Sequence, residues 1–205
     1  MTTLEIECAK NGPYLVKNLD RLENSKGDTL ATKPVTALCR CGRSANKPFC
    51  DGTHTKIGFS DARLSDGAND KRVSYAGKRV AIHDNRGICA HAGHCTEGLP
   101  AVFDSERKPW IDPDGASVEQ IVAIVRRCPS GALSYSRDGV EQREQALAPS
   151  IAVTENGPYA VVGDARIVGA GATTHRFTLC RCGASKNKPF CDGSHWEIEF
   201  KDDRN

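Results

Sequence analysis

The chain has 205 residues, with 28 Lys and Arg against 26 Asp and Glu, so its formal net charge is only +2. This balance argues against binding to nucleic acid or to a membrane surface through an excess of positive charge. Leu, Ile, Val and Phe make up just under one fifth of the residues, and aromatic residues only 6%. One large hydrophobic core is therefore not expected, and small units held together by other means are favoured.

The chain shows no segment for membrane insertion or export. Its longest uninterrupted apolar stretch, 121–125, has five residues, far fewer than a bilayer span needs. The first ten residues lack the basic start and apolar stretch of a secretory signal. We therefore expect a cytoplasmic protein. Ten cysteines are present, and because a reducing compartment disfavours disulfides, metal binding is the expected use of most of them.

One segment occurs twice in the chain. CRCGRSANKPFCDGTH at 39–54 and CRCGASKNKPFCDGSH at 180–195 agree at 13 of 16 positions. Weaker similarity extends outward, where Asn-Gly-Pro precedes both Tyr14 and Tyr159. The repeated units cover roughly 9–59 and 154–200. Because a unit of this size buries too little surface to be secure alone, the two copies are expected to pair about an approximate two-fold axis.

The predicted elements are short. Each Asn-Gly-Pro sequence is followed by β-leaning stretches that lead into a cysteine-rich loop, and polar linkers bracket a separate middle region. Strands are expected at 14–19, 36–38, 78–83, 132–135, 159–162 and 176–179, and a turn at 84–87. The expected linkers are 60–70 and 141–150. In the middle region, Ser117 and Gln120 predict a capping box that begins a helix ending near Arg127. The predicted domains are 1–62, 63–146 and 147–205.

Each repeated loop carries three cysteines and one histidine with the spacing C-x-C-x8-C-x3-H. Cys50 and His54 are four residues apart, so a helical turn that begins at Asp51 would direct both to one side. Gly42 is expected to let the chain wrap closely around a compact group. Such ligands suit a tetrahedral zinc ion or a two-iron cluster, but the single residue between the first two cysteines is tighter than structural zinc sites favour. The candidate ligands are Cys39, Cys41, Cys50 and His54 in the first copy, and Cys180, Cys182, Cys191 and His195 in the second.

This pattern resembles that of the CDGSH iron–sulfur domain proteins related to mitoNEET, C-x-C-x2-S/T-x3-P-x-C-D-G-S/A/T-H, and both copies match it at every position. The resemblance implies a 2Fe-2S cluster in each loop, with the first two cysteines on the inner iron and the third cysteine with the histidine on the outer iron. Family members with a single motif are dimers with a β-sandwich, so the resemblance implies that this chain makes that pairing within itself. The departure from the family is the insertion of about eighty residues between the copies.

A histidine ligand has physical consequences. A neutral imidazole in place of an anionic thiolate leaves a cluster less negative, so its reduction potential should lie above that of an all-cysteine ferredoxin. Because protonation of the iron-bound nitrogen in acid would remove a ligand, both redox behaviour and cluster retention should depend on pH. Lys47 and Lys188 are candidates for cations that tune each site, although exposed lysines without such a role are commoner.

The middle region resembles divergent single-cluster ferredoxins over about residues 70–136. Small bacterial ferredoxins hold a cubane cluster with C-x2-C-x2-C and a distant Cys-Pro. Here Ala92 stands in place of one cysteine, so a 3Fe-4S cluster is favoured over 4Fe-4S unless His91 or His94 supplies the fourth ligand. An ordinary polar role for these histidines, and a structural zinc site, are open alternatives. The candidate ligands are Cys89, Cys95 and Cys128.

The sequence shows no Ser-His-Asp arrangement, phosphate-binding glycine loop or dinucleotide motif, so an enzyme is not expected. The favoured function is electron transfer between redox partner proteins by two 2Fe-2S clusters and one 3Fe-4S or 4Fe-4S cluster. The alternatives are cluster storage or transfer to apo acceptors, redox or pH sensing, and a structural zinc protein that mediates interactions. The predicted fold is β-rich α+β, with two CDGSH modules paired as an intramolecular pseudo-two-fold β-sandwich and a ferredoxin-like insert. We expect a monomer with this internal pseudo-dimer.

Overall fold

The computed structural model describes residues 3–68, 70–142, 147–169 and 175–205. The chain divides into a first unit, residues 1–66 with 146–205, and a second unit, residues 67–145. The two ends of the chain therefore belong to the same unit, although 79 residues of the second unit separate them in sequence. The predicted linkers include residues 69 and 143–146, which lie outside the described residues.

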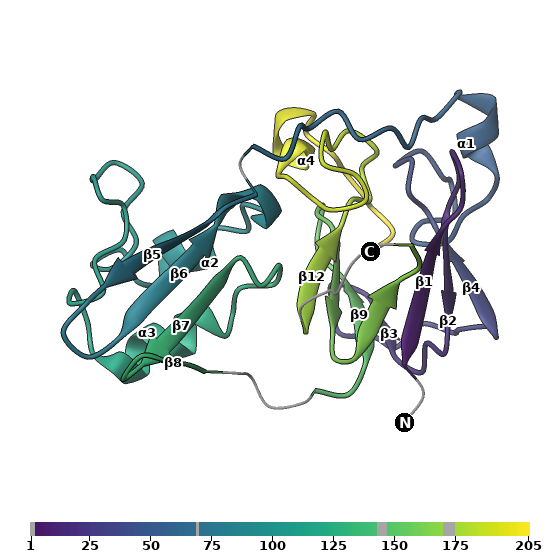
Figure 1. Cartoon of the computed structure of the whole chain (residues 1–205). Coiled ribbons are helices and arrows are strands. Elements are labelled where there is room, and N and C mark those ends of the chain that lie inside the picture. The colour runs from purple at the N-terminus through teal and green to yellow at the C-terminus, as the bar shows by residue number, and fades with distance from the viewer. Residues whose placement is uncertain (1–2, 69, 143–146, 170–174) are drawn as a thin grey trace. The chain divides into compact units, whose positions relative to one another are not determined.

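The first unit contains two four-stranded sheets, and each sheet takes strands from both halves of the unit (Figure 1). The sheet orders are β11-β1-β2-β4 and β12-β10-β9-β3. The short strands β3 and β11 are exchanged, since β3 pairs in parallel with β9, and β11 pairs in parallel with β1. The first half supplies β1 (Leu4–Cys8), β2 (Tyr14–Lys17), β3 (Leu22–Glu23) and β4 (Val35–Leu38), and the second half supplies β9 (Ser150–Val153), β10 (Tyr159–Val162), β11 (Ala165–Ile167) and β12 (Arg176–Leu179).

The core of the first unit is shared between its halves. Alternate residues of each strand point inward, as Tyr14 and Val16 do on β2, because successive side chains of a strand face opposite sides. The buried cluster contains Leu4, Ile6, Tyr14, Val16, Leu22 and Leu38 from the first half, and Ile151, Val153, Tyr159, Val161, Ile167 and Leu179 from the second. Neither half can bury its apolar surface without the other.

Two buried tyrosines cross-link the halves. The Tyr14 hydroxyl lies 2.9 Å from the Cys180 carbonyl oxygen and 3.0 Å from that of Pro189. The Tyr159 hydroxyl reaches the corresponding carbonyls of Cys39 and Pro48, each at 2.9 Å. The two rings meet edge to face, with centroids 6.1 Å apart. Each half therefore anchors the cysteine loop of the other half.

Replacement of Tyr14 by Phe should lower the free energy of unfolding of the first unit by about 1–3 kcal/mol, because it removes the donor from two buried carbonyls. Tyr159→Phe should have a similar effect. Urea unfolding followed by tryptophan fluorescence measures the change. Tyr75→Phe, in the second unit, is the control, and equal unfolding midpoints for the Tyr14 and Tyr75 variants would contradict the cross-link.

Cutting the chain within 141–150 should leave the two fragments associated. The exchanged strands and the common core hold the halves together by packing and main-chain hydrogen bonds, so the connection through the second unit is not needed for association. Size-exclusion chromatography after cleavage of an inserted protease site tests this. Elution of the fragments as separate folded species would show that the expected pairing is wrong.

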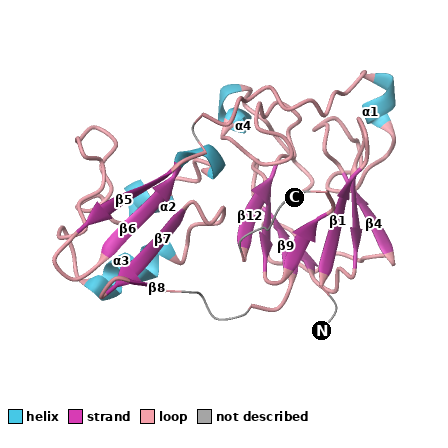
Figure 2. Ribbon diagram, viewed as in Figure 1, coloured by secondary structure: helices cyan, strands magenta, loops and turns pink. Residues whose placement is uncertain are grey.

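The second unit is an antiparallel sheet with one face covered by helix (Figure 2). The sheet order is β5-β6-β7-β8, and the short helices η1, α2 and α3 connect β6 to β7. Ser117 and Gln120 form the predicted capping box, and the helix buries Val118 and Ile121. The bounds are β5 (Arg72–Ala76), β6 (Ala81–Asn85), η1 (Arg86–Ile88), α2 (His94–Gly98), α3 (Val118–Val125), β7 (Leu133–Arg137) and β8 (Val140–Glu141).

The structure confirms a β-rich α+β chain and corrects several expected elements. The repeated units extend beyond their predicted limits, because β1 and β9 precede the Asn-Gly-Pro turns. The middle strand predicted at 78–83 is shifted to Ala81–Asn85, and β5 has no counterpart among the predicted strands. None of the helices in the described residues has the length and apolar character that crossing a bilayer requires.

Candidate metal centres

The first cysteine loop, residues 39–54, brings its four candidate ligands together as two pairs. The sulfur atoms of Cys39 and Cys41 lie 3.8 Å apart at the end of β4. The sulfur atom of Cys50 lies 3.4 Å from Nδ1 of His54, which stands on the short helix α1 (Thr53–Lys56). The histidine therefore presents Nδ1 toward its cysteine.

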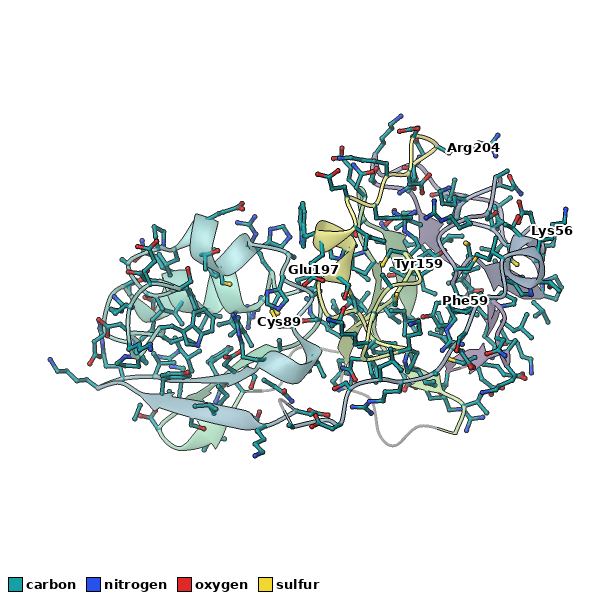
Figure 3. All side chains as sticks on the ribbon, turned by 90° about the horizontal axis from the view of Figure 1, so that it is seen from above. Lys56, Phe59, Cys89, Tyr159, Glu197 and Arg204 are labelled. Carbon is teal, nitrogen blue, oxygen red and sulfur yellow. The ribbon has the colours of Figure 1, made fainter. Side chains whose placement is uncertain are left out.

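The second cysteine loop, residues 180–195, has the same arrangement. The sulfur atoms of Cys180 and Cys182 are again 3.8 Å apart, and Cys191 Sγ lies 3.4 Å from His195 Nδ1. His195 stands on α4 (Ser194–Glu197). Both loops lie at the same end of the two sheets (Figure 2). Figure 3 shows Tyr159 among the strands below them and Lys56 at the outer edge of α1.

An aspartate holds each loop in shape. Asp51 accepts hydrogen bonds from the amides of Thr53, at 3.0 Å, and Ala45, at 2.8 Å. The side chain of Thr53, together with these two amides, holds the pKa of the Asp51 carboxyl group well below the usual range. Asp192 makes the matching contacts in the second loop. The expected helical turn begins two residues later than predicted, because Gly52 takes a left-handed conformation and Thr53 is the first helical residue.

The two lysines named above as candidates for tuning cations donate hydrogen bonds to the loop backbone. Lys47 donates to the Ser44 carbonyl at 2.9 Å, and Lys188 donates to the Ser185 carbonyl at 2.6 Å. Both ammonium groups thus complete the tight turn between the second and third cysteines. This structural contact accounts for a lysine at the same position in both copies.

The two thiols of each C-x-C pair shift each other's pKa in opposite directions. In the first pair the hydrogen bond from Cys41 lowers the pKa of the Cys39 thiol to about 6, while the same bond raises the pKa of Cys41. In the second pair the bond from Cys180 lowers the pKa of Cys182 and raises that of Cys180. The contact within each pair therefore favours the thiolate form of one of its two cysteines, and the thiolate is the form that binds a metal ion.

The two loops touch through their glycines. Gly42 has a φ of +75°, and a Cβ atom there would lie 2.4 Å from the Cys182 carbonyl oxygen. Gly183 has a φ of +83°, and its Cβ would lie 2.7 Å from the Cys41 carbonyl oxygen. Glycine is needed at these positions because the other loop approaches, whereas the sequence led us to expect a chain wrapped around a compact group.

Each C-x-C pair encloses a buried arginine, Arg40 in the first loop and Arg181 in the second. Arg181 forms an ion pair with Asp202, and Arg40 lies 3.5 Å from Asp61. The guanidinium groups also cover aromatic rings: Tyr14 and Phe59 for Arg40, Tyr159 and Phe200 for Arg181. These arginines were not predicted from the sequence. The signal that could have identified them is that both copies also have an aspartate two residues after the repeated phenylalanine.

The donors in both loops fit an iron–sulfur cluster. A structural zinc ion holds its four ligands around one centre. A two-iron cluster instead needs two ligands on each iron, which matches the two pairs of each loop. Backbone amides also point at sulfur, as Gly52 does toward Cys50 and Ala184 toward Cys182, each at 3.5 Å. Such hydrogen bonds stabilise anionic sulfur.

The second unit gathers its three cysteines around a cavity of about 220 Å³. Burial raises the pKa of the Cys89 and Cys95 thiols, and the His91 amide lies 3.4 Å from Cys89 Sγ. Residues that line this cavity include Cys89, Cys95, Cys128, Ala92, His91 and His94, so the predicted ligands and the position without a cysteine surround one space. We call these three cysteines the middle site. Three thiols around one cavity fit a cubane cluster, which is held by cysteine thiolates.

One further thiol and one carboxyl group had no role predicted from the sequence. Cys8 lies half-buried on β1, and burial raises the pKa of its thiol. Asp84, which was predicted to lie in a turn, is a strand residue that is 2% exposed and lines the cavity of the middle site. Asp84 follows the apolar Ile82 by two residues, and this spacing could have indicated that both side chains face the same side of a strand.

Comparison with known protein families agrees with these sites. The family described as iron-binding zinc finger CDGSH type matches residues 11–55 and 156–196. The family described as divergent 4Fe-4S mono-cluster matches residues 75–138. No solved structure gave a significant match.

Three curated relatives share parts of the sequence. The uncharacterized protein YjdI of Escherichia coli strain K12 is 43% identical over 61 residues, which are 30% of this chain and 80% of YjdI. YjdI of Escherichia coli O157:H7 gives the same values. The CDGSH iron-sulfur domain-containing protein NEET of Arabidopsis thaliana is 43% identical over 44 residues, which are 22% of this chain and 41% of NEET. With two complete CDGSH ligand sets and an inserted cysteine-lined cavity, the chain belongs to the CDGSH iron–sulfur domain proteins and carries a divergent 4Fe-4S mono-cluster domain between its two motifs.

Proposed function

We propose that this iron–sulfur protein is an electron carrier with a 2Fe-2S cluster in each cysteine loop and a 3Fe-4S or 4Fe-4S cluster at the middle site. The observation that carries the proposal is the grouping of each loop's ligands into two pairs, Cys39 with Cys41 and Cys50 with His54 in the first. Bound clusters of this kind accept and release single electrons. No substrate site is proposed, and the partners would be redox proteins.

Electron transfer is supported by the contact between the two loops. The backbone of Gly42 packs on the Cys182 carbonyl, and that of Gly183 packs on the Cys41 carbonyl. The loop segments that carry the ligands of the inner irons are therefore in direct backbone contact. We propose that the first unit is an intramolecular pseudo-two-fold β-sandwich, that the second is ferredoxin-like, and that the chain acts as a monomer.

A second candidate function is cluster donation to an apo acceptor protein. It is favoured by the difference in exposure between the ligand pairs of the first loop. Cys39 and Cys41 are buried, whereas Cys50 and His54 are half-buried. The imidazole of His54 is a neutral ligand, and it belongs to the more exposed pair. A cluster would therefore be released from the side of Cys50 and His54.

The test begins with anaerobic purification, followed by iron and sulfide counting and electron paramagnetic resonance. Three clusters, and their survival through repeated cycles of reduction and oxidation, are expected of a carrier. Movement of iron and sulfide to an apo-ferredoxin would favour the donor function instead. A colourless, redox-inactive protein that contains zinc would reject both, because zinc has a filled d shell and no redox chemistry.

A further inference from the structure

Asp84 stands on the wrong face of its strand for a charged residue. On β6 the side chain of Ile82 points into the core of the second unit, and Asp84 follows it two residues later. His83, between them, faces the other way, where its ring nitrogens lie 2.8 Å from Ser74 Oγ and 2.7 Å from Ser136 Oγ. Alternation along the strand therefore directs the Asp84 carboxyl group inward.

This inward carboxyl group lines the same cavity as the three cysteines of the middle site. Its Oδ1 atom is buried without a hydrogen-bond partner. Among the described residues that line the cavity, no other has a buried side-chain nitrogen or oxygen atom without a partner. Burial raises the pKa of Asp84, while the charge of Arg86 and a hydrogen bond with Trp110 act in the opposite direction. A buried acceptor without a partner is destabilising, so its presence calls for an explanation.

The other potential donors around the cavity are placed differently. His91 and His94, the expected candidates for a fourth ligand, are exposed. The Thr96 hydroxyl donates to the Gly93 carbonyl at 3.1 Å, and the Ser130 hydroxyl lies 3.6 Å from Cys128 Sγ. Asp84 is thus the buried side chain that combines a strong oxygen donor with an unused lone pair.

We propose that the Asp84 carboxylate binds the iron of the middle cluster that no cysteine holds, so that its ligands are Cys89, Cys95, Cys128 and Asp84. The proposal rests on the cluster proposed above for this cavity and selects the 4Fe-4S form. Carboxylate oxygen is a suitable ligand for iron. Coordination forms one oxygen–iron bond, any proton on the carboxyl group passes to solvent, and no electron is transferred. The positive iron compensates the negative charge of the buried carboxylate.

The experiment uses the full chain, purified anaerobically, and compares Asp84→Asn and Asp84→Ala with the wild type. The wild type should hold four irons at the middle site and show no paramagnetic signal from it when oxidised. Both variants should lose one iron per chain and gain the signal of an oxidised 3Fe-4S cluster. Asp138→Asn, at an exposed turn of the second unit, is the matched control and should behave as the wild type.

Two rescue variants separate ligation from a merely structural effect. Asp84→Cys, and Asp84→Ala combined with Ala92→Cys, should each recover the fourth iron and lose the signal. Retention of four irons and of the silent oxidised state in Asp84→Ala would overturn the proposal. A wild type that already holds only three irons would also overturn it, without any effect on the proposed electron-carrier function. A middle site without sulfide would instead reject the cluster itself, and the ligand assignment with it.

Discussion

Replacement of His54 by Cys is expected to keep the first cluster and to lower its reduction potential by on the order of 100 mV or more. The physical reason is charge, because an anionic thiolate replaces a neutral imidazole and makes the addition of an electron less favourable. The variant should also retain its colour in more acidic solution than the wild type, since the imidazole nitrogen next to Cys50 is no longer there to take up a proton.

A redox titration followed by electron paramagnetic resonance measures this shift. The second loop provides an internal control, because its ligands Cys191 and His195 have the same geometry and are unchanged in the His54 variant. His195→Cys should give the mirror-image result, with the potential of the second cluster lowered and that of the first unchanged. Unaltered potentials in both variants would refute the assignment of the histidines as ligands.

Substitution of Gly42 by Ala is expected to destabilise the first unit by about 3 kcal/mol or more. The added Cβ would lie 2.4 Å from the carbonyl oxygen and 2.8 Å from the carbonyl carbon of Cys182, both backbone atoms that cannot move aside locally. The φ of +75° adds conformational strain. The halves would have to separate at the loops, which should also impair cluster retention in both.

Gly27→Ala is the matched control for this effect. Gly27 has a φ of +87°, yet no atom lies within 4 Å of the position that its Cβ would take. Its substitution should therefore cost only about 1 kcal/mol of backbone strain. Thermal unfolding of both variants, monitored by circular dichroism and by visible absorption, distinguishes them. A Gly42 variant as stable as the Gly27 variant would mean that the two loops do not pack together.

Sequence patterns predict those features of this protein that depend on interactions between residues close together in the chain. The spacing of the cysteines and histidines indicates which side chains come together, and the structure places them in pairs. The capping box of Ser117 and Gln120 predicts the start of α3. In both cases the interacting residues lie within a few positions of each other, so the pattern contains the whole interaction.

The exchange of strands could not be predicted in this way. Leu22–Glu23 and Ala165–Ile167 are too short for a period of two to be recognised, and their partners lie in the other half of the unit. The inward position of Asp84 was hidden for a different reason. The polar run that begins there is typical of a turn, and pairing of Asp84 with Val73 on β5 and with Leu133 on β7 shows that the strand continues through it.

The strand exchange also constrains how the polypeptide can fold during its synthesis. Strand β3 ends at residue 23, and its partner β9 begins at residue 150, so roughly 130 residues must be translated before they can pair. At about 5–20 residues per second, the ribosome needs roughly 6–25 s for this distance. The second unit takes all its strand pairs from one continuous stretch, and its last strand, β8, ends at residue 141, which is 9 residues before β9 begins and 38 residues before β12 ends. The inserted domain is thus expected to fold first. The N-terminal metal loop cannot form its contacts with Tyr159 until synthesis has reached the last quarter of the chain.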